Sequence, residues 1–210
     1  MQTPFRGKSC LSLRLDRTYL YHSTKLLRIC QNGAVVHLRR LSADSLDDSR
    51  LAELLSATVN AGASVNFLAP MTPEEASAYW QTLRPQIESG ERIVLVTDDL
   101  RACVHLLLAT QPNGRHRAEV QKLLVHPEVR RQGLGRTLLA AAEEQAMQLG
   151  RTLLVLDSEK GSAGEALYEA CGWVRIGEVP GFARGSDGRW TTSVYFYKAL
   201  AQPKKTSASA

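Results

Sequence analysis

The sequence predicts an α/β fold in which helices cover a mixed β-sheet. Apolar segments with strand character alternate along the chain with segments of helical periodicity, and 44% of the 210 residues are hydrophobic. Strands before helices and helices between strands are typical of an α/β sandwich. A chain of this length and composition can bury one substantial core, so we expect a single domain.

The first half of the domain contains strand and helix patterns in turn. Residues 34–41 predict a strand, and residues 49–60 and 73–88 predict two helices joined by a loop with Gly and Pro. Residues 92–97 and 102–110 predict a hairpin across an Asp-Asp turn.

The second half begins with a strand over residues 115–126 and a long helix over about 133–149. Gly150 is a typical C′ residue and predicts the end of that helix. Residues 152–156 predict a short buried strand, and two more strands flank the turn at 185–189. One apolar face of the long helix, at helical spacing, is formed by Leu134, Leu138, Ala142, Ala146 and Leu149.

The net charge of +5 is located at one end of the chain. Residues 1–33 hold six Lys and Arg against one acid, whereas the remainder has 20 of each sign. A nucleic-acid interface is therefore not expected in the domain. We expect residues 1–33 to be a basic, flexible extension, with a targeting peptide or a start codon assigned too early as alternatives. Residues 34–200 form the predicted domain, and residues 201–210 a disordered tail.

The cysteines and the hydropathy indicate a cytoplasmic protein. Cys10, Cys30, Cys103 and Cys171 show no C-x-x-C spacing, so we expect reduced thiols and neither a metal site nor a disulfide framework. No apolar run approaches the roughly 20 residues needed to span a bilayer, so no membrane association is expected.

Residues 120–136, VQKLLVHPEVRRQGLGR, carry most of the functional information. They read as a strand, a proline break, a basic glycine-rich loop and the start of the long helix. Unpaired N–H groups and the positive dipole at a helix N-terminus, with Arg130, Arg131 and Arg136 nearby, suit a phosphate or pyrophosphate. The two loop glycines would let a ligand approach the backbone.

The loop differs from two familiar nucleotide-binding patterns. A dinucleotide fingerprint needs a third glycine where Leu138 stands, and the Gly-Lys-Ser/Thr of a Walker loop is absent. The pattern present is Arg130-x-x-Gly133-x-Gly135. It resembles the acyl-CoA-binding motif (Q/R)-x-x-G-x-(G/A) of the GNAT superfamily of N-acetyltransferases. A basic turn that caps an ordinary helix is the alternative interpretation.

A second match to the superfamily lies downstream, in SAGEALYEACGWV. It resembles a later motif in which a helix carrying Leu-Tyr, here ending in Tyr168, is followed by Gly172 and an aromatic residue. Ser162 and Glu165 form a Ser-x-x-Glu capping box, which marks the helix start independently. Many members carry an asparagine near that start, where Gly161 and Ser162 stand here.

The resemblance implies a GNAT fold with a mixed, mostly antiparallel sheet of about seven strands. It also implies acetyl-CoA as co-substrate, no metal, and polarisation of the acetyl carbonyl by a backbone N–H of a bulged strand at 123–125. The implied cofactor contacts are Leu123, Leu124, Val125, Arg130, Arg131, Gln132, Gly133, Leu134, Gly135, Arg136 and Ser162.

Four further segments resemble the tabtoxin-resistance branch of these enzymes: HRAEVQKL from residue 116, LDS from 156, GEVPGF from 177 and DGR from 187. Members of that branch acetylate the amine of a small β-lactam amino acid. The resemblance implies a small-molecule amine acceptor and a resistance-type activity, and it leaves a homodimer open.

Acetyl transfer needs a neutral amine and a proton for the leaving thiolate. Tyr168 stands where the superfamily places the acid, and a core aromatic is the alternative. Glu119 is the predicted base, on one strand face with Gln121, Leu123 and Val125 by alternation. A carboxylate among apolar strand residues is costly without a role or partner. The alternative is an ion pair of Glu119 with Arg117 or Lys122.

Asp157 ends the next buried strand, where the two central strands are expected to part. It could bind the substrate ammonium or share the role of base, and helix N-capping is the alternative. In the last hairpin, Phe182 and Trp190 could shape the acceptor pocket, and Arg189 could pair with a substrate carboxylate or be solvated. The predicted structural histidines are His105, His116 and His126.

Three functions follow from these residues. The favoured one is a small-molecule N-acetyltransferase, because an α-amine with a pKa near 8 costs only about 1–1.5 kcal/mol to deprotonate at pH 7, against roughly 4–5 for a lysine side chain. The alternatives are a protein or peptide N-acetyltransferase and a catalytically silent acyl-CoA-binding module.

Overall fold

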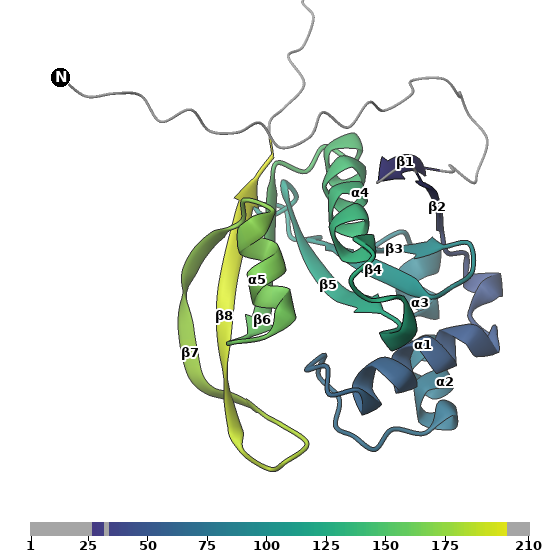
Figure 1. Cartoon of the computed structure of the whole chain (residues 1–210). Helices are drawn as coiled ribbons and strands as arrows, with labels where there is room; N and C mark the ends of the chain where they lie inside the picture. The colour runs from purple at the N-terminus through teal and green to yellow at the C-terminus, as the bar shows by residue number, and fades with distance from the viewer. Residues whose placement is uncertain (1–26, 32–33, 201–210) are drawn as a thin grey trace, which may run out of the picture.

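The computed structural model describes residues 27–31 and 34–200 (Figure 1). It confirms the α/β prediction with an eight-stranded sheet in the order β1-β2-β3-β4-β5-β6-β8-β7. Only β5 and β6 pair in parallel within the described sheet. The strands are β1 Leu27–Gln31, β2 Ala34–Arg40, β3 Arg92–Thr97, β4 Ala102–Leu108, β5 Arg117–Val125, β6 Leu153–Glu159, β7 Val174–Arg184 and β8 Trp190–Ala199.

The helices lie on both faces of this sheet. They are α1 Ser49–Asn60, α2 Pro73–Thr82, α3 Arg84–Glu88, α4 Leu134–Gln148 and α5 Ala163–Ala170, with short 3-10 helices η1 Ala43–Ser45 and η2 Pro127–Val129. None of the helices in the described residues is long and apolar enough to cross a membrane.

Strand β1 extends the sheet beyond the seven strands expected. It pairs antiparallel with β2, from Leu27 opposite Leu38 to Gln31 opposite Ala34. It falls within the predicted extension 1–33, so the sheet begins before residue 34. The rest of that segment, residues 1–26 and 32–33, and the predicted tail 201–210 lie outside the described residues.

Two apolar layers hold the helices to the sheet. On one face, Leu138, Ala142 and Ala146 of α4 are fully buried against the strands, as their spacing predicted. Leu149, predicted for the same face, follows the end of α4 and is 39% exposed. On the other face α1, α2 and α3 cover a second core around Trp80, whose indole Nε1 donates to the Leu51 carbonyl at 2.8 Å.

The predicted helix over residues 73–88 is wrong in one respect, because the structure has two helices there. Helix α2 starts with a complete capping box between Thr72 and Glu75, so its beginning follows from the sequence. It ends at Thr82, and α3 begins at Arg84, immediately before Pro85. A proline lacks the N–H that would continue the helix and its ring collides with the preceding turn, which explains the break.

The last hairpin, β7–β8, forms one end of the sheet and reaches toward the loop between α1 and α2 (Figure 1). Its turn follows the predicted position, with Gly185 N–H bonded to the Arg189 carbonyl at 2.9 Å. The tip contacts that loop, because the Ala69 N–H donates to the Ser186 hydroxyl at 2.7 Å.

Candidate active site

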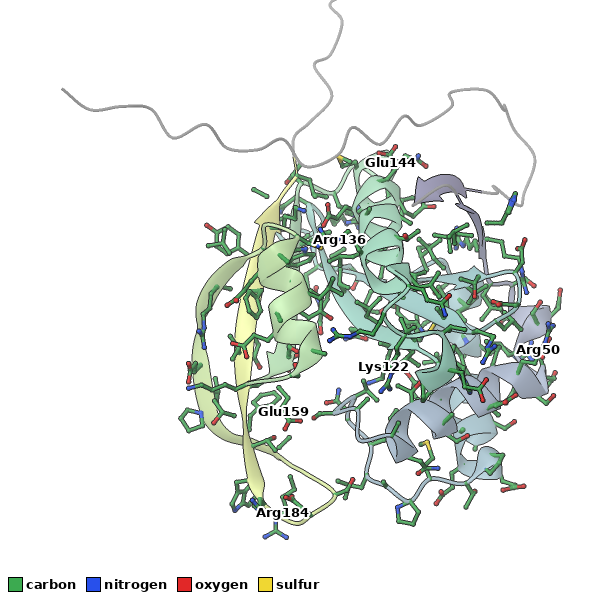
Figure 2. All side chains as sticks on the ribbon, viewed as in Figure 1. Arg50, Lys122, Arg136, Glu144, Glu159 and Arg184 are labelled. Carbon is green, nitrogen blue, oxygen red and sulfur yellow. The ribbon has the colours of Figure 1, made fainter. Side chains whose placement is uncertain are left out.

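The sheet opens at its centre, where its two parallel strands separate. Strands β5 and β6 are paired only from Arg117 opposite Leu153 to Glu119 opposite Val155, although both strands continue. A cleft of about 630 Å³ occupies the opening. Figure 2 shows Lys122 and Glu159, which both line the cleft, on its two sides.

A glycine-rich loop at one end of the cleft leads into α4 with its backbone donors uncovered. Gly133 is the N-cap of α4 in the left-handed region, with φ 81°, and no side chain caps the first turn. The first turn also lacks an acidic residue. Unpaired N–H groups and the positive end of the helix dipole therefore face an anion site.

Three arginines surround this helix start, and all are exposed cleft residues. Arg130 Nε donates to the Val125 carbonyl at 3.2 Å, and Arg136 Nη1 to the Ala170 carbonyl at 3.4 Å. Arg131 has a positive φ of 63°. The loop thus combines backbone dipoles with exposed positive charge, a combination that suits a pyrophosphate.

The two motif glycines have different structural reasons. Gly133 supplies the left-handed backbone that turns the chain into α4. At Gly135 a Cβ atom would lie 3.1 Å from Leu167 Cδ2, so this glycine allows α4 to pack closely on α5. The sequence argument credited both glycines to ligand approach alone and did not anticipate this helix contact.

Most of the predicted cofactor residues line the cleft, and two do not. Leu124 is buried on the opposite face of the sheet, and Gln132 is an exposed loop residue outside the cleft lining. The predicted residues that line it are Leu123, Val125, Arg130, Arg131, Gly133, Leu134, Gly135, Arg136 and Ser162.

A β-bulge in β5 corrects the predicted alternation of side chains. Cys103 of β4 lies opposite Leu124, but His105 lies opposite Gln121, so β5 carries one extra residue between them. Lys122, at this bulge, has a φ of 47°. Leu123 and Val125 consequently pack on the α4 side of the sheet, while Gln121 turns toward Arg92 and the α3 side.

Glu119 is held by neutral partners and lies at the last paired position of β5. The Gln121 amide donates to Glu119 Oε1 at 2.8 Å, and Arg92 Nη1 donates to Gln121 Oε1 at 2.9 Å. In the described residues Glu119 forms no ion pair with Arg117 or Lys122, which was the alternative. The carboxylate is therefore oriented toward the cleft through an amide, with no cation in direct contact to neutralise it.

Asp157 projects from β6 just beyond the point where the two strands part, as expected. The Ser193 hydroxyl donates to Asp157 Oδ2 at 2.6 Å, which fixes the carboxylate from β8. Asp157 is not a helix N-cap, because Ser162 caps α5 by accepting from the Glu165 N–H at 3.1 Å. Glu165 in turn accepts from Gly161 rather than from Ser162, so the predicted capping box is displaced by one residue.

Tyr168 belongs to both the core and the cleft. Its ring lies 6.0 Å from the centroids of both Trp173 and Phe196, and it also lines the cleft. Burial, followed by the negative charge of Asp157, raises the pKa of Tyr168 well above its ordinary value of 10. The hydroxyl therefore keeps its proton at neutral pH and can act only as a donor of it.

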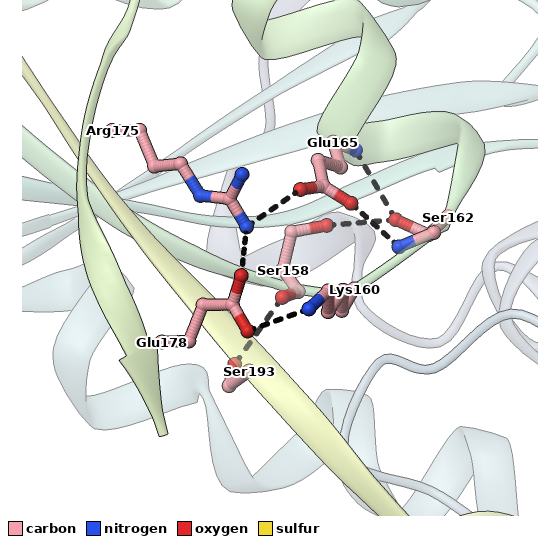
Figure 3. A network of polar contacts seen from close by, with 8 residues as sticks. Ser158, Lys160, Ser162, Glu165, Arg175, Glu178 and Ser193 are labelled. Carbon is pink, nitrogen blue, oxygen red and sulfur yellow. Dashed lines mark hydrogen bonds and ion pairs between the residues drawn. The ribbon is translucent and has the colours of Figure 1, made fainter. Parts of the chain in front are cut away.

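A polar network fixes the end of β6 and the start of α5 against β7 (Figure 3). Arg175 contacts Glu178 and lies 3.4 Å from Glu165, while Lys160 contacts Glu178 at 2.7 Å. The network lies beside Ser162, the N-cap of α5, six residues before Tyr168. It therefore restrains the helix that carries the candidate acid.

Lys122 is a cleft residue that the sequence argument considered only as an ion-pair partner. Its Nζ donates to the Val65 carbonyl at 2.7 Å and lies 5.2 Å from the Phe67 ring centroid and 5.9 Å from that of Tyr79. Burial, with repulsion from Arg92, lowers the pKa of Lys122 from 10.5 to about 8. A lysine within an apolar strand was the available signal.

The structure places one of the three predicted residues of the last hairpin in the cleft. Phe182 lines the cleft. Arg189 instead pairs with Asp187 at 3.1 Å and its side chain is 85% exposed, so it does not face the cleft. Trp190 is 65% exposed and lies under Arg184 at the hairpin tip (Figure 2). Both belong to the outer surface, because the hairpin turn directs them away.

The three histidines do not line the cleft. His105 is fully buried between Arg92 and Trp80, and burial lowers its pKa well below the ordinary 6.5. His126 is buried beside Arg101, at 3.1 Å from its Nη2. His116 is exposed, and its carbonyl accepts from Thr152 at the start of β6.

The parted central strands and the uncapped helix N-terminus beside them are the features expected of an acyl-CoA-dependent transferase. Residues 64–173 match the model of the acetyltransferase (GNAT) family. The chain belongs to this family and is an acetyl-CoA-dependent acetyltransferase.

Solved structures with the same fold include three acetyltransferases. A GNAT superfamily phosphinothricin acetyltransferase from Sinorhizobium meliloti, in complex with acetyl-CoA, is 18% identical with a TM-score of 0.64. The match covers 81% of this chain and 94% of the Sinorhizobium chain. An N-acetyltransferase from Staphylococcus aureus Mu50 is 15% identical with a TM-score of 0.65, covering 80% and 100%. A ribosomal-protein-alanine N-acetyltransferase from Brucella melitensis is 24% identical with a TM-score of 0.62, covering 78% and 99%. They show the fold, and they do not confirm the tabtoxin-resistance branch.

Proposed function

We propose that this protein transfers the acetyl group of acetyl-CoA directly to the amine of a small, amino-acid-like molecule. The observation that carries the proposal is the contact beside the cleft, where Ser186 of the β7–β8 turn meets Ala69 of the α1–α2 loop at 2.7 Å, three residues beyond the cleft residues Ala183 and Asn66. A cleft of about 630 Å³ bounded by two loops in contact suits a compact acceptor better than a protein chain.

The chain's residues divide the reaction between the two sides of the cleft. Glu119 and Asp157 bind the acceptor ammonium and accept its proton, either directly or through water. Acetyl-CoA supplies an activated thioester, and the new N–C bond forms as the C–S bond breaks. Tyr168 then donates its proton to the departing sulfur and regains one from water.

The loop before α4 would hold the pyrophosphate of the co-substrate. Its fit rests on the bare N-terminus of α4 and the three exposed arginines beside it. The backbone of β5 after Glu119 has no strand partner on the β6 side and can bind the acyl arm, with an N–H at the bulge polarising the acetyl carbonyl.

The surroundings of the two carboxylates also favour a small α-amine, because such an amine is easier to deprotonate than a lysine side chain. Neither carboxylate has a described cation in direct contact, and each is held by a single neutral donor, Gln121 or Ser193. Such groups can remove a proton from an amine of pKa near 8 at a cost of about 1–1.5 kcal/mol. The resemblance to the tabtoxin-resistance branch makes β-lactam amino acids the first acceptors to test.

A screen of small amines, peptides and proteins with labelled acetyl-CoA tests the proposal. We expect label and free thiol to appear together with small amino-acid-like acceptors. Incorporation confined to proteins or peptides would assign the alternative acetyltransferase activity. Tight CoA binding without thiol release, across the whole screen, would instead indicate a silent acyl-CoA-binding module.

A further inference from the structure

The acceptor half of the cleft contains charge of both signs in a fixed arrangement. Glu119 projects from the last paired position of β5, and Asp157 from β6 across the opening. Lys122 lies three residues beyond Glu119, at the bulge, and also lines the cleft. The two carboxylates and the ammonium therefore face one space from the two strands that part.

Lys122 is a confined cation without a carboxylate partner. Within the described residues its Nζ makes one hydrogen bond, to the neutral Val65 carbonyl, and no ion pair. The rings of Phe67 and Tyr79 lie close to the same nitrogen, with centroids at 5.2 and 5.9 Å. An ammonium has three donors, so two remain for a ligand in the cleft.

The charged groups around Lys122 leave it short of negative charge. Burial disfavours the charge of the Lys122 ammonium, and Arg92 of β3 repels it. Asp157 of β6 and Glu119 of β5 attract it, but more weakly, so the pKa of Lys122 falls to about 8. The Cys103 thiol of β4 is neutral, because burial raises its pKa to about 12. The Tyr79 hydroxyl of α2 is neutral for the same reason, with a pKa of about 12. An anionic ligand group would supply the missing counter-charge.

We propose that Lys122 binds an anionic group of the acceptor, so that the enzyme selects amines that also carry an acid. Glu119 and Asp157 then receive the ammonium end and Lys122 the acidic end of one zwitterionic molecule. This inference rests on the proposed function and deepens it. It assigns to Lys122 the acid recognition for which the sequence pointed to Arg189, whose side chain lies outside the cleft.

Matched acceptors test the assignment. Each α-amino acid that the enzyme accepts is compared with its primary amide and with its decarboxylated amine, in the wild-type protein and in Lys122→Met and Lys122→Arg. We expect the wild type to prefer the acid at least tenfold in kcat/KM. Lys122→Met should lose that preference through KM, and Lys122→Arg should keep part of it. Comparing each variant with the wild type cancels differences in amine pKa between acceptors.

Lys160→Met is the matched control, because Lys160 also lines the cleft but pairs with Glu178. The acid-to-amide preference should survive this change. Thermal unfolding and the Kd for acetyl-CoA confirm that each variant folds and binds its co-substrate. A phosphonate analogue of the best amino acid distinguishes a general anion site from one shaped for a carboxylate.

The possible results separate this inference from the proposed function. Equal preference in wild type and Lys122→Met, or a wild type indifferent to the acid, overturns the role of Lys122 while the acetyltransferase activity stands. If no small amine is acetylated, the proposed function fails. In that case, calorimetry with CoA and the same amino acids tests the role of Lys122 by itself. Equal affinity of wild type and Lys122→Met for these amino acids would overturn that role.

Discussion

A single residue of this protein can belong to the core and line the cleft at once. Tyr168 is the clearest example, because its ring completes an aromatic cluster with Trp173 and Phe196 and its edge faces the cleft. The core and acid interpretations of this residue are therefore compatible. Burial raises the pKa of the hydroxyl, so the oxygen keeps its proton at neutral pH.

Removing that hydroxyl while keeping the ring isolates its chemical role. We expect Tyr168→Phe to lower kcat by roughly 10²- to 10⁴-fold, the usual contribution of a general acid, with little change in stability. Thiol release under saturating acceptor measures kcat, and the Kd for acetyl-CoA serves as the control. An unchanged kcat would assign Tyr168 to packing alone.

We expect Lys122, in contrast to Tyr168, to lower the stability of the folded protein. Its pKa is about 8 in the folded protein against an ordinary 10.5, so the folded state disfavours the cation. The penalty is fully present below pH 8 and is relieved as the pH rises toward 10.5, where the unfolded chain also loses the proton. A shift of this size corresponds to at most about 3 kcal/mol, before the lost contacts of Nζ are deducted.

Lys122→Met should therefore raise the free energy of unfolding at pH 7. The gain over wild type should shrink between pH 8 and 10.5, as followed by denaturant unfolding of both proteins across that range. A gain that does not vary with pH would mean that Lys122 is not destabilised as a cation.

At the scale of elements, the sequence predicted most helices and strands, and the family resemblance implied a bulged strand at 123–125, but the predicted alternation of side chains took no account of it. Helix α1 and strand β3 have the predicted bounds, because their apolar periodicity and flanking signals agree. The faces of β5 do not, since alternation fails once Lys122 adopts a positive φ. The extra residue is specified by register with β4, a tertiary feature that one strand's sequence does not encode.

The same limit explains which site residues could be predicted. The cofactor loop is a local motif, so its position and its glycines follow from the sequence. The side chains at the acceptor end come from β5, β6 and the α1–α2 and β7–β8 loops. Their directions depend on the bulge and on the turn at 185–189, which is why the sequence indicated Lys122 only as an ion-pair partner and Arg189 as a residue facing the acceptor.

The start of α4 depends on a backbone conformation that most residues avoid. With φ at 81°, Gly133→Ala should destabilise the protein by roughly 1–2 kcal/mol and weaken acetyl-CoA binding. Gly133→Asn should cost less on both measures, because asparagine tolerates the left-handed region. Denaturant unfolding and calorimetry with acetyl-CoA test the pair. Equal losses in both variants would show that the absence of a side chain, rather than the positive φ, is what the loop requires.

At the scale of the whole molecule, the sheet consists of two parts that meet where β5 pairs with β6. Strands β1 to β5 with α1 to α4 form one part, and β6 to β8 with α5 the other. Their parallel pairing extends only from Arg117 to Glu119, so the two sides of the cleft are joined by few backbone hydrogen bonds. The glycine-rich loop before α4 and Lys122 lie in the first part, and Asp157 and Tyr168 in the second.

This division predicts which backbone groups a bound co-substrate protects. Beyond Glu119, β5 has no partner on its β6 side, so its outward N–H groups exchange with solvent unless the acyl arm covers them. We expect acetyl-CoA to slow hydrogen–deuterium exchange at residues 120–125 and 133–137. Adenosine 3′,5′-bisphosphate, which has the nucleotide without the acyl arm, should slow exchange only at the start of α4. Protection of β5 by this shorter ligand would mean that the two parts close on the nucleotide alone, and protection of neither segment by acetyl-CoA would place its binding elsewhere.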